Sequence, residues 1–296
     1  MLDPSGPFTV AERDVVYARP DGLELVVRLY DPVEAPRPRP VLVEIHGGAW
    51  SSGDRTLGAP YNRAVAACGA LVAAPEFRDG RNAAHPSAAA DVAAAVRWVR
   101  ANAAELGADP ARVALAGSSS GGHLALYTAL RPGLTALGAT PIETPQGLRA
   151  APELGAGVGW VGAFWPPADP LARYRYAQGE IGKPVPEGQQ FSAKGLVKFT
   201  EAYFGNEAAM GEASIARIVA AGEAEALPAV WLVQAGADLN VPASILDELE
   251  AAYRAAGGAL ERTFYEGEVH GFGRGDTPGA ERFRADLVAR VVKALG

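Results

Sequence analysis

The stretch that most constrains this 296-residue chain is Gly117-Ser118-Ser119-Ser120-Gly121-Gly122. The apolar residues 112–116 before it are typical of a buried strand, and residues 123–130 after it have the composition of a helix. A strand, a sharp Gly-x-Ser-x-Gly turn and a helix project a serine hydroxyl from the sheet edge as a nucleophile. Such a turn strains the serine backbone, and its glycines are required because strand and helix approach too closely for a Cβ atom.

Three consecutive serines raise a question of register. Only Ser119 has a glycine both two residues before it and two residues after it, at Gly117 and Gly121. With Ser120 at the turn, Ser118 would bring an extra side chain into a crowded position. We therefore expect Ser119 to be the nucleophile. The alternative is a Ser/Gly loop in another α/β protein, since short motifs produce false positives.

A second informative stretch, residues 46–50 (His-Gly-Gly-Ala-Trp), directly follows the apolar strand predicted at residues 41–45. Glycines at this point let backbone N–H groups turn toward a ligand, and negative charge that develops on a carbonyl oxygen needs such donors. We expect the N–H groups of Gly48, Ala49 and Ser120 to form this oxyanion-binding site. A plain glycine turn is the alternative.

The chain has four histidines, so each can be considered as a catalytic base. His270 lies in a loop after the last predicted strand and is free to reach Ser119. His123 lies one turn into the helix after Ser119, where its side chain would point along the helix. His46 is expected to support the glycine loop by hydrogen bonding, and His85 receives no role.

The acid that orients the base should lie between the serine and the histidine in chain order. Asp238 directly follows the buried strand predicted at residues 229–236 and precedes His270 by 32 residues. Glu268 is a weaker candidate because it shares the loop of the histidine. We therefore expect the catalytic residues to be Ser119, Asp238 and His270.

Composition narrows the class of protein. A formal net charge of -7, without a dense Lys/Arg patch, argues against a nucleic-acid or anionic-membrane partner. Cys68 is the one cysteine, so no internal disulfide can form. The first residues lack the pattern of a signal peptide, and no run of 18 apolar residues occurs. A soluble cytoplasmic protein is the expectation.

Strands and helices alternate from Val41 onward, after a predicted antiparallel hairpin over residues 14–17 and 23–30. This alternation predicts a mostly parallel sheet of about eight strands with helices on both faces, in a single domain over residues 1–296. Residues up to about Glu12 are expected to be a tail.

The pattern changes over residues 166–228, where prolines, glycines, aromatic residues and basic residues are frequent. We interpret this segment as an insertion that caps the strand ends. It could be a surface excursion with a minor core of its own, a lid that shapes a substrate pocket, or both. The aromatic residues expected to line that pocket are Trp50, Phe164, Trp165 and Tyr174.

The motifs at residues 46–50, 117–125, 236–242 and 270–272 together resemble those of the α/β-hydrolase fold. Within it the chain is similar to the bacterial feruloyl-esterase-like, kynurenine-formamidase-like and hormone-sensitive-lipase-like carboxylesterases. One departure is that Ser118 and Ser120 stand where these families usually carry Asp or His before the nucleophile and Ala after it. The departure leaves the three catalytic candidates intact.

The resemblance implies a serine carboxylesterase that hydrolyses small to medium esters through an acyl-enzyme on Ser119. Neither a metal nor an organic cofactor is expected. An amidase such as an arylformamidase with the same triad is the alternative, with an acyltransferase or a non-catalytic ligand-binding module as further alternatives. The expected partner is a small-molecule ester; the oligomeric state is left open, a homodimer included.

Overall fold

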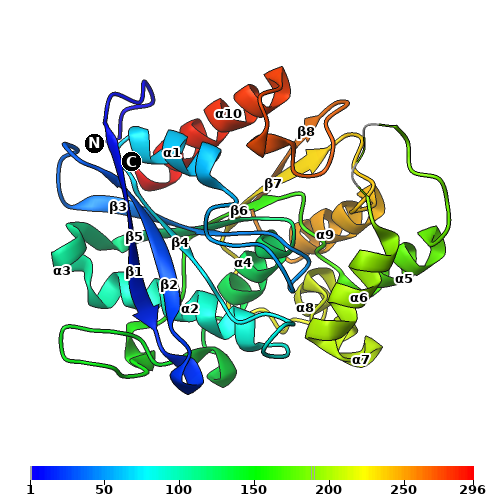
Figure 1. Cartoon of the computed structure of the whole chain (residues 1–296), viewed down its shortest axis with the longest axis horizontal. Helices are drawn as coiled ribbons and strands as arrows, with labels where there is room; N and C mark the ends of the chain where they lie inside the picture. Colours follow the sequence, from blue (N-terminus) through cyan, green and yellow to red (C-terminus); the bar gives the residue numbers. More distant parts are fainter. Residues whose placement is uncertain (1, 188, 190) are drawn as a thin grey trace.

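The structure is a computed structural model that describes residues 2–187, 189 and 191–296, and within them one eight-stranded sheet forms the centre (Figure 1). The strands lie in the order β1-β2-β4-β3-β5-β6-β7-β8. β1 pairs antiparallel with β2, and β2 with β4, whereas the other neighbours pair parallel. The predicted mostly parallel sheet is therefore confirmed. The bounds are β1 (Val10–Ala18), β2 (Leu25–Pro32), β3 (Arg39–Ile45), β4 (Leu71–Pro75), β5 (Ala108–Ser118), β6 (Trp160–Phe164), β7 (Ala229–Ala235) and β8 (Leu260–Tyr265).

Helices cover both faces of the sheet, as predicted (Figure 1). α1 (Ala59–Ala67) and α10 (Pro278–Leu295) pack on one face, and α2 (Ser87–Ala101), α4 (Ser120–Leu130) and α9 (Ala243–Ala255) pack on the other. Shorter helices are α3 (Ala103–Leu106) and the 3-10 turns η1 (Pro20–Gly22), η2 (Thr135–Gly138), η3 (Pro152–Leu154) and η4 (Phe272–Arg274). Within the described residues, no helix has the length and apolar character needed to cross a membrane.

The central strands are buried on both faces, which explains their nearly continuous apolar sequence. In β3, Val41, Val43 and Ile45 pack with α2 and α4, whereas Leu42 packs with α1 and α10. Successive side chains of a strand point to opposite faces, so one strand contributes to both cores. The site therefore stands on a rigid, two-sided scaffold.

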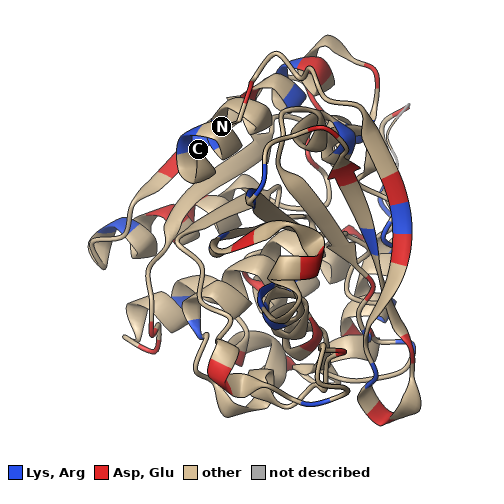
Figure 2. Cartoon of the chain, turned by 90° about the vertical axis from the view of Figure 1, so that its left-hand side faces the viewer, with Lys and Arg blue, Asp and Glu red and all other residues tan. Residues whose placement is uncertain are grey.

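The first strand begins earlier than the sequence predicts. Residues up to Glu12 were expected to be a tail, but β1 starts at Val10 and pairs with β2 from Val10↔Pro32 onward. The charged residues of β1 interrupt the apolar pattern from which a strand is predicted. They are tolerated because Arg28 of β2 lies opposite and pairs with both Glu12 and Asp14. Figure 2 shows charges of both signs along this outer part of the sheet.

The segment between β6 and β7 contains α5 (Pro170–Glu180), α6 (Ala193–Phe204), α7 (Glu207–Glu212) and α8 (Ile215–Ala220). It lies to the right in Figure 1, beside the ends of the central strands. Tyr203, Phe204 and Ile218 are buried and belong to the same apolar cluster as α2 and α4. The segment therefore contributes to the main core.

The start of α4 packs against the ends of β3 and β5 with no room for a side chain. A Cβ atom on Gly121 would lie 2.0 Å from the carbonyl oxygen of Ile45, and one on Gly117 would lie 2.4 Å from the backbone of Gly121. The sequence-based argument that both glycines are required is confirmed. Between them, Ser119 has φ 53° and ψ -126°, the strained conformation expected at the turn.

We predict that Gly121→Ala destabilises the protein by at least ~2 kcal/mol, because the new methyl group must displace backbone rather than a flexible side chain. Urea denaturation measures this. Gly179→Ala is the matched control, since its Cβ would meet no described atom within 4 Å and alanine favours the α5 helix. Equal stability of the two variants would contradict the packing argument.

A buried carboxyl group lies in the middle of the sheet, at Glu44 of β3. The side chain is 1% exposed and accepts hydrogen bonds from the Tyr61 hydroxyl and the Asn62 amide, both at 3.0 Å. Burial raises the pKa of Glu44 from 4.5 to about 7. Because the folded state holds its proton more tightly than the unfolded state, stability falls as the pH rises from about 4.5 to about 7.

We predict that Glu44→Gln flattens this pH dependence, since glutamine is neutral throughout. The free energy of unfolding of the variant, relative to the original protein, should improve by up to ~3 kcal/mol between pH 5 and pH 8. Urea denaturation at both pH values measures the change. Glu248→Gln, at an exposed position of α9, should show no such pH-dependent gain. The same difference at both pH values for Glu44→Gln would refute the assignment.

Candidate functional site

Ser119 stands at the junction of β5 and α4, where the strained turn directs it into a cavity that it helps to line. Its N–H donates to the carbonyl of Phe164 in the neighbouring strand β6 at 2.8 Å. The adjacent Ser120 differs: its hydroxyl is buried and has no hydrogen-bond partner in the described structure. The geometry therefore supports the predicted register, with Ser119 as the exposed hydroxyl.

A hydrogen-bonded chain joins the three predicted catalytic residues. The Nε2 atom of His270 lies 2.9 Å from the Ser119 hydroxyl oxygen, and its Nδ1 lies 2.8 Å from Oδ2 of Asp238. A carboxylate only accepts, so Nδ1–H donates to Asp238 and the free Nε2 accepts from the Ser119 hydroxyl. This is the arrangement in which a histidine can remove a proton from a serine.

Backbone contacts bring these residues together from three strands. Asp238 follows β7 and His270 follows β8, and the two loops are joined by the N–H of Ala237, which donates to the carbonyl of Glu268 at 2.8 Å. The other oxygen of Asp238 accepts the N–H groups of Asn240 and Val241. Both carboxylate oxygens are thereby satisfied, which fixes the acid against the imidazole.

The weaker candidate acid, Glu268, faces elsewhere. Its carboxylate accepts a hydrogen bond from the hydroxyl of Thr277, the residue that caps α10. A Cβ atom on Gly279 would lie 2.1 Å from it, so the side chain packs against the start of that helix. The structure therefore brings Asp238, and not Glu268, to the histidine.

The glycine loop after β3 lies beside Ser119. A Cβ atom on Gly47 would lie 3.1 Å from Cβ of Ser119, and one on Gly48 would lie 1.9 Å from the carbonyl oxygen of Ser52. Gly48 has φ 133°, and Ala49 and Trp50 also have positive φ, at 51° and 60°. Ala49 thus occupies a left-handed conformation that favours glycine.

Two carbonyl groups of this loop accept hydrogen bonds from neighbouring groups. Nδ1–H of His46 donates to the Gly47 carbonyl at 2.8 Å, and the Ser51 N–H and Ser52 hydroxyl donate to the Gly48 carbonyl. In a trans peptide the N–H points opposite to the C=O. The N–H groups of Gly48 and Ala49 are therefore directed away from these donors, and neither donates a hydrogen bond within the described residues.

The cavity around Ser119 has a volume of about 470 Å³. It lies between the glycine loop, the turn at Ser119, the loops after β7 and β8, and the helices α5 and α6 of the segment 166–228. Its apolar wall is formed by Leu57, Trp165, Leu196, Phe199 and Val241, and its polar residues include Ser192, Asn240, Arg173 and Arg274. A small organic molecule could reach the Ser119 hydroxyl here.

Of the four aromatic residues expected to line the pocket, Trp165 does so. Trp50 lies in the core, where its indole N–H donates to Nδ1 of His123. Phe164 packs against α1 and α10, and the Tyr174 hydroxyl bonds to Glu201. The expectation failed for these three because position along the chain does not reveal on which side of the loop, strand or helix a side chain lies.

None of the other three histidines lines the cavity around Ser119, and two of them, His46 and His123, are buried. His123 lies between the Trp50 indole and the Ala213 carbonyl, and burial lowers its pKa to about 4. Burial also lowers the pKa of His85 to about 3 and lowers that of His46, whose ring stacks on Phe77. These rings are therefore neutral near pH 7.

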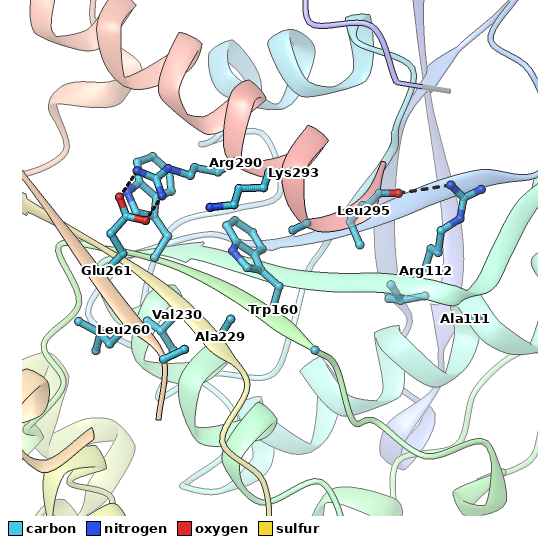
Figure 3. A pocket seen from close by; sticks show the side chains of 15 residues that line it. Ala111, Arg112, Trp160, Ala229, Val230, Leu260, Glu261, Arg290, Lys293 and Leu295 are labelled. Atoms are coloured by element: carbon cyan, nitrogen blue, oxygen red, sulfur yellow. Dashed lines mark hydrogen bonds and ion pairs between the residues drawn. The ribbon is translucent and has the colours of Figure 1, made fainter. Parts of the chain in front are cut away.

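A larger hollow, about 630 Å³, lies at the opposite ends of the strands (Figure 3). Trp160 stands in its middle, beneath α10, and Arg290 pairs with Glu261 at its border. None of Ser119, Asp238 and His270 lines it. The candidate site is therefore chosen by the hydrogen-bonded series of Ser119, His270 and Asp238, and not by cavity volume.

Two arginines of the smaller cavity were not singled out from the sequence as site residues. Arg173 belongs to the basic residues of the segment 166–228, and Arg274 follows His270 in the loop after β8. The basic composition of that segment was the one available signal for Arg173, and the sequence offered none for Arg274. No group of three or more His, Cys, Asp or Glu residues that could hold a metal ion occurs within the described residues.

Comparison with known proteins agrees with this geometry. The BD-FAE family model matches residues 27–162. Carboxylesterase NlhH of Mycobacterium tuberculosis is 41% identical over 122 residues, which are 40% of this chain and 37% of that protein. The arylesterase of Saccharolobus solfataricus is 32% identical over 108 residues, 36% of this chain and 35% of that protein. The match thus spans little more than a third of these relatives' length.

Solved structures extend the likeness over the whole chain. Esterase 2 of Thermogutta terrifontis, phosphoramylated by tabun, superposes with a TM-score of 0.72 at 26% identity, covering 96% of this chain and 95% of that one. A bacterial heroin esterase superposes with a TM-score of 0.74 at 24% identity, covering 100% and 86%, which shows the fold alone. The chain therefore has the α/β-hydrolase fold, and it is similar to esterases in sequence and in structure.

Proposed function

We propose that this protein is a serine carboxylesterase that hydrolyses small to medium esters through an acyl-enzyme on Ser119. The observation that carries the proposal is the unbroken hydrogen-bonded chain from Ser119 through His270 to Asp238, at 2.9 and 2.8 Å, opening into a 470 Å³ cavity. The names of the relatives, carboxylesterase and arylesterase, support an ester over an amide as substrate. A non-catalytic binding module would have no need of these two hydrogen bonds between Ser119, His270 and Asp238.

The reaction follows from these positions. His270 takes the proton of Ser119 as the hydroxyl oxygen attacks the ester carbonyl, and Asp238 stabilises the imidazolium that forms. The carbonyl oxygen becomes negative and is bound by the N–H groups of Gly48, Ala49 and Ser120. His270 then returns the proton to the departing alcohol. Water, activated by the same histidine, hydrolyses the acyl-enzyme and restores Ser119.

The segment 166–228 acts as a cap in this proposal. Residues of α5 and α6 supply part of the cavity wall, and Ser51 of the glycine-loop region bonds to the carbonyl of Phe199 in α6. Trp165, Leu196 and Phe199 give the cavity an apolar side suited to the hydrocarbon part of an ester. A single domain, a cytoplasmic location and the option of a homodimer stay predictions from the sequence.

We predict that a small organophosphonate or sulfonyl fluoride forms one adduct per chain, on Ser119. Peptide mass spectrometry locates it, and hydrolysis of a 4-nitrophenyl ester should stop in parallel. Ser119→Ala should abolish both, and His270→Ala should slow both by ~10³-fold or more because the hydroxyl is no longer activated.

Ser120→Ala is the matched control. It removes a neighbouring hydroxyl that makes no hydrogen bond in the described structure but keeps the backbone N–H. This variant should retain labelling and turnover. A folded Ser119→Ala protein with full turnover would overturn the proposal. Parallel assay of an aryl ester and the matching anilide tests the amidase alternative.

We also predict that His46→Phe lowers kcat by ~10- to 100-fold with little change in KM. Phenylalanine keeps the ring stacked on Phe77 but cannot donate to the Gly47 carbonyl, so the Gly48 N–H is no longer held in place. Steady-state kinetics measure both constants. An unchanged kcat would show that the loop holds its conformation without this hydrogen bond.

A further inference from the structure

Arg173, in the cap helix α5, is a buried cation that lines the cavity around Ser119. The residue is 2% exposed, and its guanidinium lies 5.0 Å from the centre of the Trp50 ring. Nη2 donates to the hydroxyl of Thr200 in α6 at 2.7 Å. Burial lowers the pKa of Arg173 to about 10, so the side chain still carries its charge at neutral pH.

Within the described residues, the other donors of this guanidinium have no hydrogen-bond partner. Nε is buried without a hydrogen-bond partner, and Arg173 forms no ion pair with the part of the chain that the structure describes. Asp238 is the acid whose charge acts on it, but both oxygens of that carboxylate are already engaged by His270 and two backbone N–H groups. A buried guanidinium with unused donors is costly unless an anion meets it.

The two other contacts of Arg173 do not remove this cost. A neutral hydroxyl at Thr200 and the aromatic face of Trp50 stabilise a cation, but neither carries a negative charge. Packing alone would be satisfied by an apolar side chain of similar length. The planar donor fork of arginine is matched by a carboxylate, which binds it through two parallel hydrogen bonds.

The charge of the whole cavity points the same way. The chain carries 27 Lys and Arg against 34 Asp and Glu, a net charge of -7. The cavity nevertheless contains Arg173 in its wall and the exposed Arg274 at its border, and within the described residues no Asp or Glu lines it. An acidic protein thus presents a cationic cavity beside its reactive serine, and such a cavity attracts anions.

We propose that Arg173 binds a carboxylate of the substrate, so that this site takes esters carrying an anionic group in preference to neutral esters. This inference rests on the proposed esterase function. Arg173 belongs to the cap helix α5, whereas the oxyanion-binding N–H groups belong to the loop after β3 (Gly48 and Ala49) and to the start of α4 (Ser120). The carboxylate therefore lies apart from the ester carbonyl that Ser119 attacks, and Arg173 acts as a specificity-determining residue.

The test compares anionic esters with neutral partners of nearly the same shape. On the acyl side, the 4-nitrophenyl half-esters of succinic, glutaric and adipic acid are each compared with their methyl esters, after subtraction of the enzyme-free rate. On the alcohol side, 4-acetoxybenzoate is compared with methyl 4-acetoxybenzoate. We expect at least a tenfold higher kcat/KM for the anionic member in one of the two series, declining as salt is added.

The Arg173→Met variant should bring that ratio to one or below, mainly through KM, whereas Arg173→Lys should retain part of it. The ratio is the readout because a purely structural role would change both members equally. Arg175→Met is the matched control: it lies on the same helix but is exposed and pairs with Glu207, so its ratio should equal that of the original protein.

The outcomes separate this proposal from the esterase proposal. If neutral esters are hydrolysed and Ser119 is labelled, but neither series shows a preference for the anionic member, the role proposed for Arg173 is overturned. The esterase proposal is not affected by this result. A preference that survives in Arg173→Met would also overturn the role of Arg173. No labelling and no hydrolysis of any ester would overturn the esterase. If Arg173→Met does not fold, the ratio in the original protein and in Arg173→Lys still decides.

Discussion

The close contact between the start of α4 and the end of β3 is the constraint on which the site depends. Gly121 lies so near the carbonyl of Ile45 that no side chain fits between them. Two consequences follow from this one contact. The chain must turn sharply at Ser119, which places the hydroxyl above the sheet, and the loop that begins at His46 must pass directly beside it. The proposed nucleophile and the proposed oxyanion-binding loop are therefore positioned by the same backbone packing.

The second requirement of the site is that its donors are oriented before the substrate arrives. Stabilising a developing charge is effective when the N–H groups need no reorganisation during the reaction. Here each of two peptide planes is held from its carbonyl side, one by His46 and the other by Ser51 and Ser52. Asp238 is fixed in a similar way by two backbone N–H groups. The reacting groups thus depend on a surrounding layer of hydrogen bonds, and that layer is contributed largely by backbone.

The sequence was sufficient to predict that Ser119, Asp238 and His270 lie together, because this depends on chain order and backbone geometry. The glycine spacing around Ser119 specifies the turn, and the positions of Asp238 and His270 after predicted strands place both at one edge of a parallel sheet. The pocket walls were predicted less well, because the direction of a side chain depends on the exact twist of its loop. Trp50 illustrates this: its positive φ turns the indole into the core, toward His123. Likewise, Arg173 and Arg175 cannot be distinguished in the sequence, yet one is buried in the cavity and the other exposed.

A buried charge that forms no ion pair within the described residues is also an argument about energetics. The charge of Arg173 lowers stability in the empty protein, since the desolvated guanidinium is only partly compensated by Thr200 and Trp50. An apolar residue would avoid this cost, so a function offers a better account of the arginine than packing does. A ligand that supplies the missing negative charge restores the balance, and any species that binds the folded state alone stabilises it. In the proposed complex, the unfavourable desolvation of Arg173 in the empty protein becomes the source of selectivity, because a neutral ester would leave the guanidinium without a negative partner.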